Sequence, residues 1–457
     1  MRRLGPAIVL ALALLLTPAA AAALPPIHHV FVIVLENEGA ATTFAPGSPA
    51  PYLSHTLRAR GAYVPRYYGI GHQSGDNYIA MISGQAPNPQ TQADCQLFSD
   101  FVGGSTGAGG QVAGTGCVYP AGVPTVASQL AAGGLTWRDY NEGMGADPAR
   151  ETVVCAHPAV GSRDNTQTAT AGDQYATRHN PFVYFHSIID DTALCDSHVV
   201  GLDYLPQDLA APQPATYAFI TPNLCHDGHD ATCAGGGAGG LAGADEFLRR
   251  WVPVITGSAA YRRDGGLLLV IFDEAQTNDT TACCGEIPGP GSPLPGINGP
   301  GGGDTGAVLL SPYIRGGTVT AQPYNHYTML RSVEDLFGLR HIGYASLPNE
   351  RSFGNDVFAC APAVSPVARH GRLPAGSEFT APRLLGHGSR RSLTLKSVGA
   401  ASLTVRVVIH HHHSRLLRRT LTPCASATVR LPRLGHATIR VAAVPLSGGI
   451  QRASLRY

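Results

Sequence analysis

The sequence predicts an α/β protein with a mostly parallel β-sheet, followed by a small all-β domain. Three observations support this fold class. Short runs of β-branched and other apolar residues have the composition of strands that are buried on both faces. Segments with apolar residues at helical spacing lie between these runs, as in an α/β sheet with crossover helices. Beyond residue 362 apolar and polar residues alternate, which favours antiparallel strands joined by turns.

The strand predictions rest on these apolar runs. Residues 28–35 and 265–272 give the clearest predictions, because each is a continuous β-branched or aliphatic stretch. Shorter runs predict further strands at residues 61–68, 134–140, 216–220 and 306–310. In the C-terminal part the alternating segments are residues 392–398, 402–409, 427–431 and 437–441.

The helix predictions rest on apolar spacing and on signals at the helix ends. The expected helices cover residues 51–60, 125–131, 247–255 and 325–337. Gly338 has the position of a C-cap residue. A further helix is expected at Ser74, because the serine oxygen of an N-cap accepts a backbone N–H from the first turn, here residues 75–77. The pattern of residues 183–189 fits either a helix or a strand.

The N-terminus has the features of a secretory signal. Arg2 and Arg3 precede an apolar run at 7–16, and small residues follow at 17–23. We therefore expect a secreted or periplasmic protein with a signal peptide at 1–23, a catalytic domain at 24–362 and a β-rich domain at 363–457. No other apolar run is long enough to span a bilayer, so stable membrane insertion is not expected.

Composition narrows the function further. The chain has 457 residues with a formal net charge of +1, and no basic run is interleaved with aromatic residues, so no nucleic-acid partner is expected. The 10 cysteines all follow the signal, which favours disulfides in an exported protein. Segments 86–122 and 275–303 are rich in Gly and Pro and predict long surface loops. We expect Cys95 and Cys117 to close the first of these loops.

Polar side chains follow several predicted strands directly. Glu36 and Asn37 come after the first strand, and Asp273 and Glu274 follow strand 265–272. The loop 221–230 is also dense in His, Asp and Asn. Each motif alone is typical of a polar loop. Together they indicate a ligand site, because the carboxyl ends of parallel strands meet at one sheet edge.

The residue types at this edge suit a cation and a phosphate. Carboxylate and amide oxygens are ligands for a hard divalent cation such as calcium, magnesium or manganese. If histidine joins the ligands, zinc or iron also becomes possible. The helix that starts at Ser74 has free N–H groups and a positive dipole end, which favour a phosphate. A serine hydroxyl held there can attack phosphorus.

The order of the motifs resembles one known family. The motifs are Val-Ile-Val-Leu-Glu-Asn, His-x-Ser-x-x-Asn-Tyr-x-Ala-x-x-Ser-Gly, Asp-Gly-His-Asp, Phe-Asp-Glu and Asn-His-Tyr-x-x-Leu-Arg-x-x-Glu-Asp-Leu-Phe-Gly-Leu. Over residues 30–339 this order resembles the bacterial phosphoesterase family, which includes secreted acid phosphatases and non-specific phospholipases C. The resemblance implies an alkaline phosphatase-like α/β/α sandwich.

The resemblance also implies roles for individual residues. The implied metal-binding residues are Glu36, Asn37, Ser74, Asp273 and Glu274. Ser74 matches the nucleophile, and Asn77 matches a donor to a phosphate oxygen. The histidines that match positions near the transferred phosphate are His179, His226 and His229. The chain departs from many members by having Glu274 where they have a second Asp, and by having Ser74 where the phospholipase branch often has Thr.

These features together predict a secreted, metal-dependent hydrolase of phosphate monoesters with a phosphoseryl intermediate on Ser74. The cofactor is expected to be calcium, magnesium, manganese or zinc. The expected partner is a phosphate ester, and a phospholipid remains an alternative substrate. Two other functions stay open. One is a phospholipase C-type phosphodiesterase, and the other is a secreted binding protein that keeps the fold without catalysis.

Overall fold

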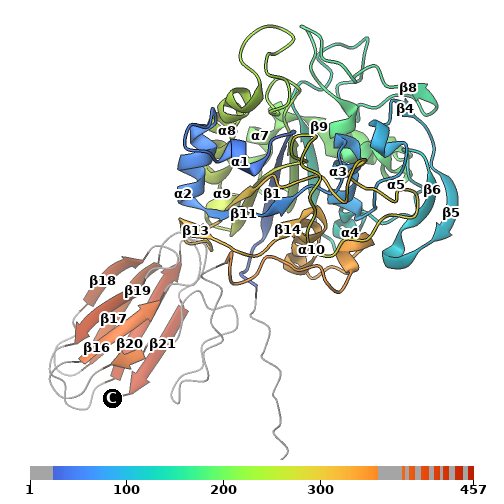
Figure 1. Ribbon diagram of the computed structural model, residues 1–457. Coiled ribbons are helices and arrows are strands. Elements are labelled where there is room, and N and C mark those ends of the chain that lie inside the picture. Colours follow the sequence, from blue (N-terminus) through green and yellow to red (C-terminus); the bar gives the residue numbers. More distant parts are fainter. Residues whose placement is uncertain are drawn as a thin grey trace, which may run out of the picture.

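The computed structural model describes residues 24–358 and, beyond them, the strands between Arg383 and Arg456 (Figure 1). The predicted signal segment 1–23 lies outside the described residues, as do Cys360 and Cys424. The α/β class predicted from the sequence is confirmed, because a large mixed sheet lies between layers of helices (Figure 1).

The large sheet has eight strands and is mostly parallel. Its strand order is β13-β2-β12-β11-β1-β10-β7-β9, and only β12 runs antiparallel to its neighbours β11 and β2. The strands are β13 (Thr318–Val319), β2 (Ala62–Val64), β12 (Ala307–Leu310), β11 (Gly266–Phe272), β1 (His29–Leu35), β10 (Tyr217–Thr221), β7 (Trp137–Asn141) and β9 (Val199–Gly201). Three strand pairs lie outside this sheet, namely β3 (Tyr67–Tyr68) with β14 (Tyr324–Asn325), β4 (Leu97–Phe98) with β8 (Ser162–Arg163), and β5 (Val102–Thr106) with β6 (Val112–Thr115).

The register of the central strands decides where the site forms. Strands β1 and β11 pair in parallel along their whole length, so that Leu35 lies opposite Phe272. The ladder continues one step further, because the backbone N–H of Asp273 donates to the carbonyl of Leu35 at 2.8 Å. The polar residues that follow each strand therefore leave the sheet side by side.

Both faces of the sheet are covered by helices. Along β1, alternate residues belong to two separate hydrophobic clusters, with Val30, Val32 and Val34 in one and Phe31 and Ile33 in the other. The first cluster contains residues of α3, α4 and α10, and the second contains residues of α7, α8 and α9 (Figure 1). Burial of each such aliphatic side chain stabilises the fold by about 1.5–3 kcal/mol.

The helices and helical turns have the following bounds. The α-helices are α1 (Ala40–Thr43), α2 (Arg58–Arg60), α3 (Ser74–Ser83), α4 (Val126–Ala132), α5 (His186–Ile189), α6 (Thr192–His198), α7 (Leu205–Ala210), α8 (Gly240–Gly257), α9 (Ala259–Arg262) and α10 (His326–Phe337). The other turns are η1 (Tyr52–Leu57), η2 (Thr91–Ala93), η3 (Ala108–Gly110), η4 (Thr177–His179), η5 (Pro181–Tyr184), η6 (Leu202–Tyr204) and η7 (Gly343–Ser346).

Most predicted elements are present, with three differences. Segment 86–122 is not a plain loop, because strands β5 and β6 pair within it. Helix α8 begins well before residue 247, since its first turns contain small residues that carry no apolar period. Residues 183–189 divide into the turn η5 and the short helix α5. The predicted C-cap Gly338 is confirmed, with a left-handed φ of 66°.

The strands after residue 382 are all antiparallel. They are β15 (Arg383–Leu385), β16 (Arg391–Lys396), β17 (Leu403–His410), β18 (Leu416–Leu421), β19 (Ser426–Leu431), β20 (Thr438–Pro445) and β21 (Gln451–Arg456). They form the sheets β15-β16-β19 and β18-β17-β20-β21, and none of them joins the eight-stranded sheet. The predicted antiparallel character of this region is confirmed, while the domain limit at 362 stays a prediction.

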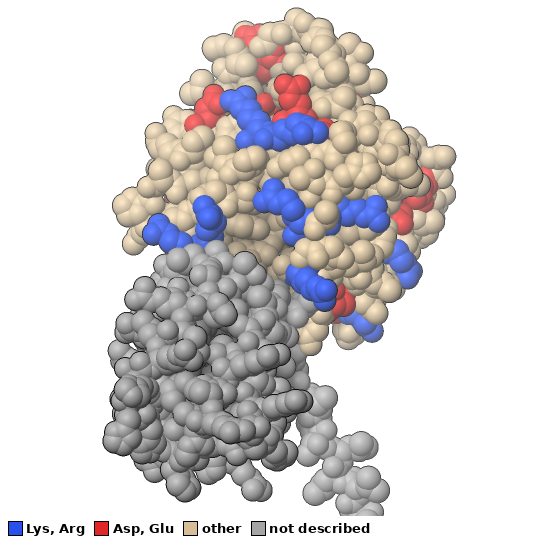
Figure 2. Space-filling view, turned by 90° about the vertical axis from the view of Figure 1, so that its left-hand side faces the viewer, with Lys and Arg blue, Asp and Glu red and all other residues tan. Residues whose placement is uncertain are grey.

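Disulfides and surface charge complete the description. The predicted bond between Cys95 and Cys117 is present. The other described bonds are Cys155–Cys195, Cys225–Cys233 and Cys283–Cys284. Positive side chains gather on the side of the molecule that contains α2, α8 and α9 (Figure 2), where Arg60, Arg249, Arg250, Arg262 and Arg263 are exposed. In the described part of the chain, no helix has both the length and the hydrophobicity of a membrane span.

Candidate active site

The site lies at the carboxyl ends of β1 and β11, where the register brings two acidic pairs together. The carboxylate of Asp273 accepts hydrogen bonds from the backbone N–H groups of Asn37 at 3.0 Å and Glu274 at 2.6 Å. Asn37 has a left-handed φ of 55°, so the chain turns sharply after β1. The backbone N–H of Glu36 donates to the carbonyl of Asp227 at 2.8 Å, which adds the loop after β10 to the same edge.

Ser74 is the first residue of α3 and not its N-cap. The N-cap is Gln73, whose side chain makes no capping hydrogen bond. The Ser74 hydroxyl donates to Glu36 Oε2 at 2.7 Å instead of capping the helix. Ser74 is 6% exposed and Glu36 is fully buried. The sequence interpretation of Ser74 as a cap was therefore wrong, but the hydroxyl does lie at the start of the helix.

Asn77 and Glu274 hold one another within the site. The side-chain oxygen of Asn77, Oδ1, accepts from the backbone N–H groups of Ile70 at 2.7 Å and Gly71 at 3.0 Å. Its amide nitrogen donates to Glu274 Oε2 at 2.8 Å and to carbonyls of the loop before α3. The other Glu274 oxygen lies 3.6 Å from His72 Nδ1. The Asn77 side chain is thus fully occupied by the protein.

His179 lies between two carboxylates. Its Nε2 is 3.2 Å from Glu36 Oε1 and its Nδ1 is 3.8 Å from Asp227 Oδ2. The ring of Tyr78, from α3, stacks on the imidazole with an interplanar angle of 8°. Turn η4 supplies His179, β1 leads to Glu36, and the loop after β10 supplies Asp227. Segments that are distant in sequence therefore meet around Glu36.

Burial determines the protonation of these groups. Burial raises the pKa of Glu36 well above its usual value, and the charges of Asp273 and Asp227 raise it further. Burial also raises the pKa of Asp227 to about 7. The pKa of His179 is well below its usual value, first because the ring is buried and then because Arg178 is adjacent. The imidazole is therefore neutral, as a metal ligand or a proton acceptor must be.

The donor set fits a divalent cation. One ligand atom each of Glu36, His179 and Asp227 lie within 4.8 Å of one another. Several buried polar atoms here lack a hydrogen-bond partner, namely Glu36 Oε1, Asn37 Oδ1, Asp227 Oδ2, Asp273 Oδ2 and both ring nitrogens of His179. Unpartnered buried carboxylates are costly unless a cation pairs with them. Oxygens from the predicted ligands and one imidazole could therefore hold a metal.

The two histidines of the 221–230 loop lie further out. His226 is within 2.9 Å of Glu142, and its side chain is 31% exposed. His229 pairs with Asp230 at 2.7 Å, and its side chain is 43% exposed. Neither contacts Ser74 or Glu36 among the described hydrogen bonds and ion pairs. Of the three predicted histidines, only His179 lies in the buried part of the site.

Sequence reasoning missed three residues of this region as site residues. Asp227 lies in the flagged 221–230 loop, and the density of His, Asp and Asn in that loop was the available signal. Arg178 directly precedes His179 but reads as a surface turn residue. Asp94 lies in a segment without periodicity, and no sequence pattern indicated that its carboxylate accepts from Gly75 N–H at 2.9 Å.

A buried hydroxyl, several carboxylates and an imidazole thus lie together at the carboxyl ends of β1 and β11. The model of the Phosphoesterase family matches residues 47–340, and the chain therefore belongs to this family. This confirms the predicted family and the class of phosphoric ester hydrolases. Glu36 and Asn37 lie just outside the matched range.

Two relatives have names that agree with this family. The chain is 26% identical over 327 residues to a phosphatidylinositol-3-phosphatase of Mycobacterium tuberculosis, covering 72% of this chain and 82% of that protein. It is 25% identical to a phosphate-repressible acid phosphatase of Penicillium chrysogenum, covering 54% of this chain and 47% of that protein. A phosphonate monoester hydrolase from Silicibacter pomeroyi is similar in structure with 10% identity and a TM-score of 0.38, covering 86% of this chain and 88% of that chain.

Proposed function

We propose that the protein is an exported, metal-dependent phosphomonoesterase that works through a phosphoseryl intermediate on Ser74. The observation that carries this proposal is the 2.7 Å hydrogen bond from the Ser74 hydroxyl to Glu36, at the start of a helix and among unpartnered carboxylate oxygens. The disulfides and the N-terminal segment support export.

In this proposal the hydroxyl of the serine is the nucleophile. Its oxygen forms a bond to phosphorus while the bond from phosphorus to the leaving oxygen breaks. Glu36 Oε2 already accepts the hydroxyl hydrogen bond, so it is the nearest acceptor for the proton. Water then attacks the phosphoserine and releases phosphate.

A divalent cation would be held by Glu36, Ser74 and Asp273, with Asn37 or with His179 and Asp227 completing the ligands. When bound, it would lower the pKa of the serine hydroxyl and offset charge on the phosphoryl oxygens. Glu274 is held by Asn77 and lies beside His72, so we assign this pair to positioning the loop before α3. That assignment replaces the phosphate-donor role that the resemblance implies for Asn77.

The leaving oxygen needs a proton when it departs. His229 is a half-exposed imidazole on the loop that carries Asp227, and its backbone N–H donates to the Asp227 carboxylate at 2.9 Å. Because its side chain is 43% exposed, His229 can reach a leaving group that extends to solvent. We therefore propose His229 as the general acid, and we assign His179 to the buried side near Glu36.

Monoester hydrolysis is the better supported reaction. The names of the relatives, acid phosphatase and phosphatidylinositol-3-phosphatase, both denote removal of a phosphate group. The second name also supports a phosphorylated lipid headgroup as a second candidate substrate. Para-nitrophenyl phosphate, a short-chain phosphatidylinositol 3-phosphate and bis-para-nitrophenyl phosphate would separate soluble monoesterase, lipid monoesterase and diesterase activity.

The test of the proposal is the Ser74→Ala variant. We expect kcat on para-nitrophenyl phosphate to fall by a factor of at least about 10³, because the nucleophile is lost. Circular dichroism and thermal melting should remain close to those of the wild type, since Ser74 contributes one hydrogen bond. Chelation of the wild-type enzyme should also remove activity, and one added divalent cation should restore it.

A matched control is Ser83→Ala at the other end of α3. Ser83 is buried and donates to the carbonyl of Ile79 at 2.7 Å, within its own helix. It makes none of the contacts around Glu36, so its loss should leave kcat within a factor of about three of the wild type. Substantial turnover by Ser74→Ala would refute the proposed nucleophile.

A further inference from the structure

The proposed site gathers acidic groups, which are ionised when they ligate a cation. Four buried acidic residues lie at this edge of the sheet, namely Glu36, Asp227, Asp273 and Glu274, and Glu36 accepts from the Ser74 hydroxyl at 2.7 Å. A phosphate monoester at neutral pH is itself a dianion. One divalent cation offsets only part of this charge, so the reaction requires another positive group close to the phosphoryl oxygens.

Arg178 is the group that can supply this charge. It is the only arginine among the buried residues between 24 and 358. Lys396 is the only lysine of the chain and lies far beyond the catalytic segments in sequence. The charge of Arg178 acts on Glu36, Asp227 and Glu274, which places the guanidinium within electrostatic range of all three carboxyls.

The protein uses little of the hydrogen-bonding capacity of Arg178. One nitrogen, Nη1, donates to the carbonyl of Gln167 at 2.9 Å. A second, Nε, lies 4.0 Å from Asp94 Oδ2, a long ion pair, and the side chain remains 11% exposed. A guanidinium has five N–H donors in a planar fork. The described residues therefore leave donors of Arg178 for a ligand.

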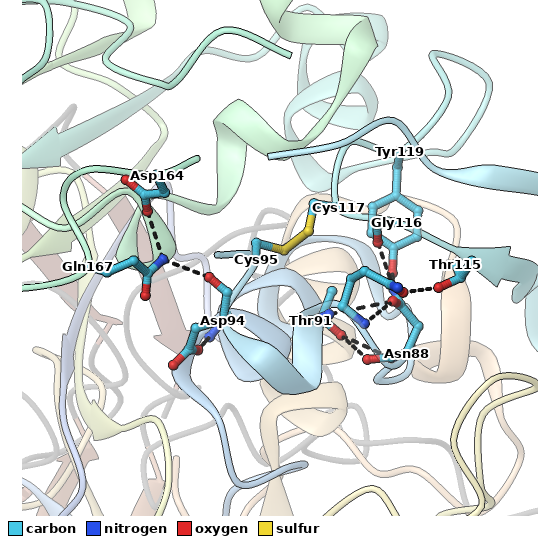
Figure 3. The surroundings of a disulfide bond; sticks show 12 residues. Asn88, Thr91, Asp94, Cys95, Thr115, Gly116, Cys117, Tyr119, Asp164 and Gln167 are labelled. Atoms are coloured by element: carbon cyan, nitrogen blue, oxygen red, sulfur yellow. Dashed lines mark hydrogen bonds between the residues drawn. A yellow bond between two sulfur atoms is a disulfide. The ribbon is translucent and has the colours of Figure 1, made fainter. Parts of the chain in front are cut away.

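A rigid frame holds the guanidinium next to the start of α3. Asp94 Oδ1 accepts from Gly75 N–H at 2.9 Å, one residue after Ser74. The Gln167 amide donates to the Asp94 carbonyl and to Asp164, each at 2.8 Å (Figure 3). The disulfide Cys95–Cys117 fixes the chain directly after Asp94 (Figure 3). Arg178 and Ser74 are thus both tied to this frame.

We propose that Arg178 binds oxygens of the transferred phosphoryl group and selects dianionic monoesters over monoanionic diesters. This inference rests on the proposed function and names the substrate class of that site. The planar fork of arginine matches two phosphoryl oxygens, which a lysine cannot do. A diester offers fewer free oxygens and one less negative charge, so it gains less from Arg178.

The experiment compares Arg178→Gln with the wild-type residue in the full-length, metal-loaded Ser74→Ala protein. Binding of inorganic phosphate is measured by calorimetry, which needs no turnover. We expect Arg178→Gln to weaken phosphate binding by at least about tenfold, because a charge-assisted contact is lost. Arg178→Lys keeps the charge and should give an intermediate loss, which keeps the test available if the Gln variant does not fold.

Substrate selectivity gives a second readout in the enzyme with Ser74 intact. Arg178→Gln should lower kcat/KM on para-nitrophenyl phosphate by about tenfold or more, and on the bis-ester by less than about threefold. If Arg178 had only a structural role, its substitution would lower kcat/KM on the two esters by the same factor. Equal losses on the two esters, or phosphate affinity within twofold of the wild type, would overturn the proposal.

Arg150→Gln is the matched control. Arg150 also pairs with an aspartate, Asp173, at 3.0 Å, and donates to carbonyls of Asn165 and Thr168 in the loop that contains Gln167. Its substitution should lower the melting temperature but leave phosphate affinity within twofold of the wild type. If Ser74→Ala were active, the proposed nucleophile would be refuted, but the proposal for Arg178 would not, since phosphate binding by Arg178 is measured separately.

Discussion

At the scale of single residues, two buried carboxyls of this protein differ sharply in their surroundings. Glu36 lies among a hydroxyl, an imidazole and other carboxyls that can share a cation. Asp139 on β7 is equally buried, but its only hydrogen-bond partner is Asn141 at 2.7 Å, and its second oxygen has none. Burial raises the pKa of Asp139 to about 8. This carboxyl therefore folds in its neutral form.

The pH dependence of stability follows from this shift. The unfolded pKa of an aspartate is about 3.9. Since the folded pKa is higher, the stability associated with Asp139 is fully present below about pH 4 and is lost as the pH rises toward 8. Asp139→Asn is almost isosteric and carries no such cost, so it should raise the melting temperature at pH 8. Thermal melting at several pH values measures this effect.

The control is the same comparison at pH 4, where both side chains are neutral. At this pH the melting temperatures of the wild type and Asp139→Asn should be nearly equal, apart from a small effect of the changed hydrogen bonding. A gain of equal size at pH 4 and pH 8 would show that Asp139 does not fold in the neutral form.

At this scale the sequence predicted the location of side chains that directly follow a predicted strand. Glu36 and Asp273 follow the two clearest apolar runs, and parallel pairing of those runs places them together. Sequence reasoning failed for Arg178 and Asp94, because both lie in irregular segments whose path depends on tertiary contacts. It also misjudged the Ser74 side chain, since a choice between capping the helix and bonding Glu36 depends on the partner.

At the scale of elements, the start of α3 depends on a residue from another segment. Helix α3 has no capping side chain of its own, and Asp94 supplies an acceptor for Gly75 N–H instead. Cys95–Cys117 holds this carboxylate in place. The helix that carries Ser74 is therefore capped by a residue from a different segment of the same chain. This contact links the 86–122 segment to the site.

Asp94→Ala tests this link. The substitution leaves an N–H of the first turn without its acceptor, so the free energy of unfolding should fall by about 1–2 kcal/mol. Asp94→Asn keeps an oxygen acceptor and should cost less. Urea denaturation of the three proteins in the oxidised form gives the values. An equal or larger loss in Asp94→Asn would contradict the capping role.

Elements with strong patterns were predictable, and weakly patterned ones were not. Strands β1 and β11 and helix α10 have long apolar or amphipathic sequences and appear within a residue or two of the predicted bounds. The hairpin of β5 and β6 contains exposed Gly, Ser and Thr, so no alternation marked it. The early turns of α8 lack an apolar period for the same reason.

At the scale of the whole molecule, every residue assigned to the site lies between Glu36 and Glu274. Helix α10 adds a support from further along the chain, because His326 Nε2 donates to the carbonyl of Asp273 at 2.6 Å. Burial lowers the pKa of His326 to about 4, so this ring is neutral.

A chain that ends at residue 362 therefore tests the predicted domain limit. We expect it to fold and to retain kcat/KM on para-nitrophenyl phosphate within a factor of about three, because every residue assigned to the site, and the supporting His326, comes before that limit. A folded but inactive truncated protein would contradict the predicted division. The full-length protein purified in the same way is the control.

The central claim is that Ser74 carries the phosphoryl group during turnover. The most direct measurement is rapid acid quenching of the metal-loaded enzyme with its substrate, followed by mass spectrometry of the proteolytic peptides. The account predicts phosphate on Ser74 that appears during turnover and disappears when substrate is exhausted. Continued turnover with no phosphorylated Ser74, or with phosphate on another residue, would contradict it.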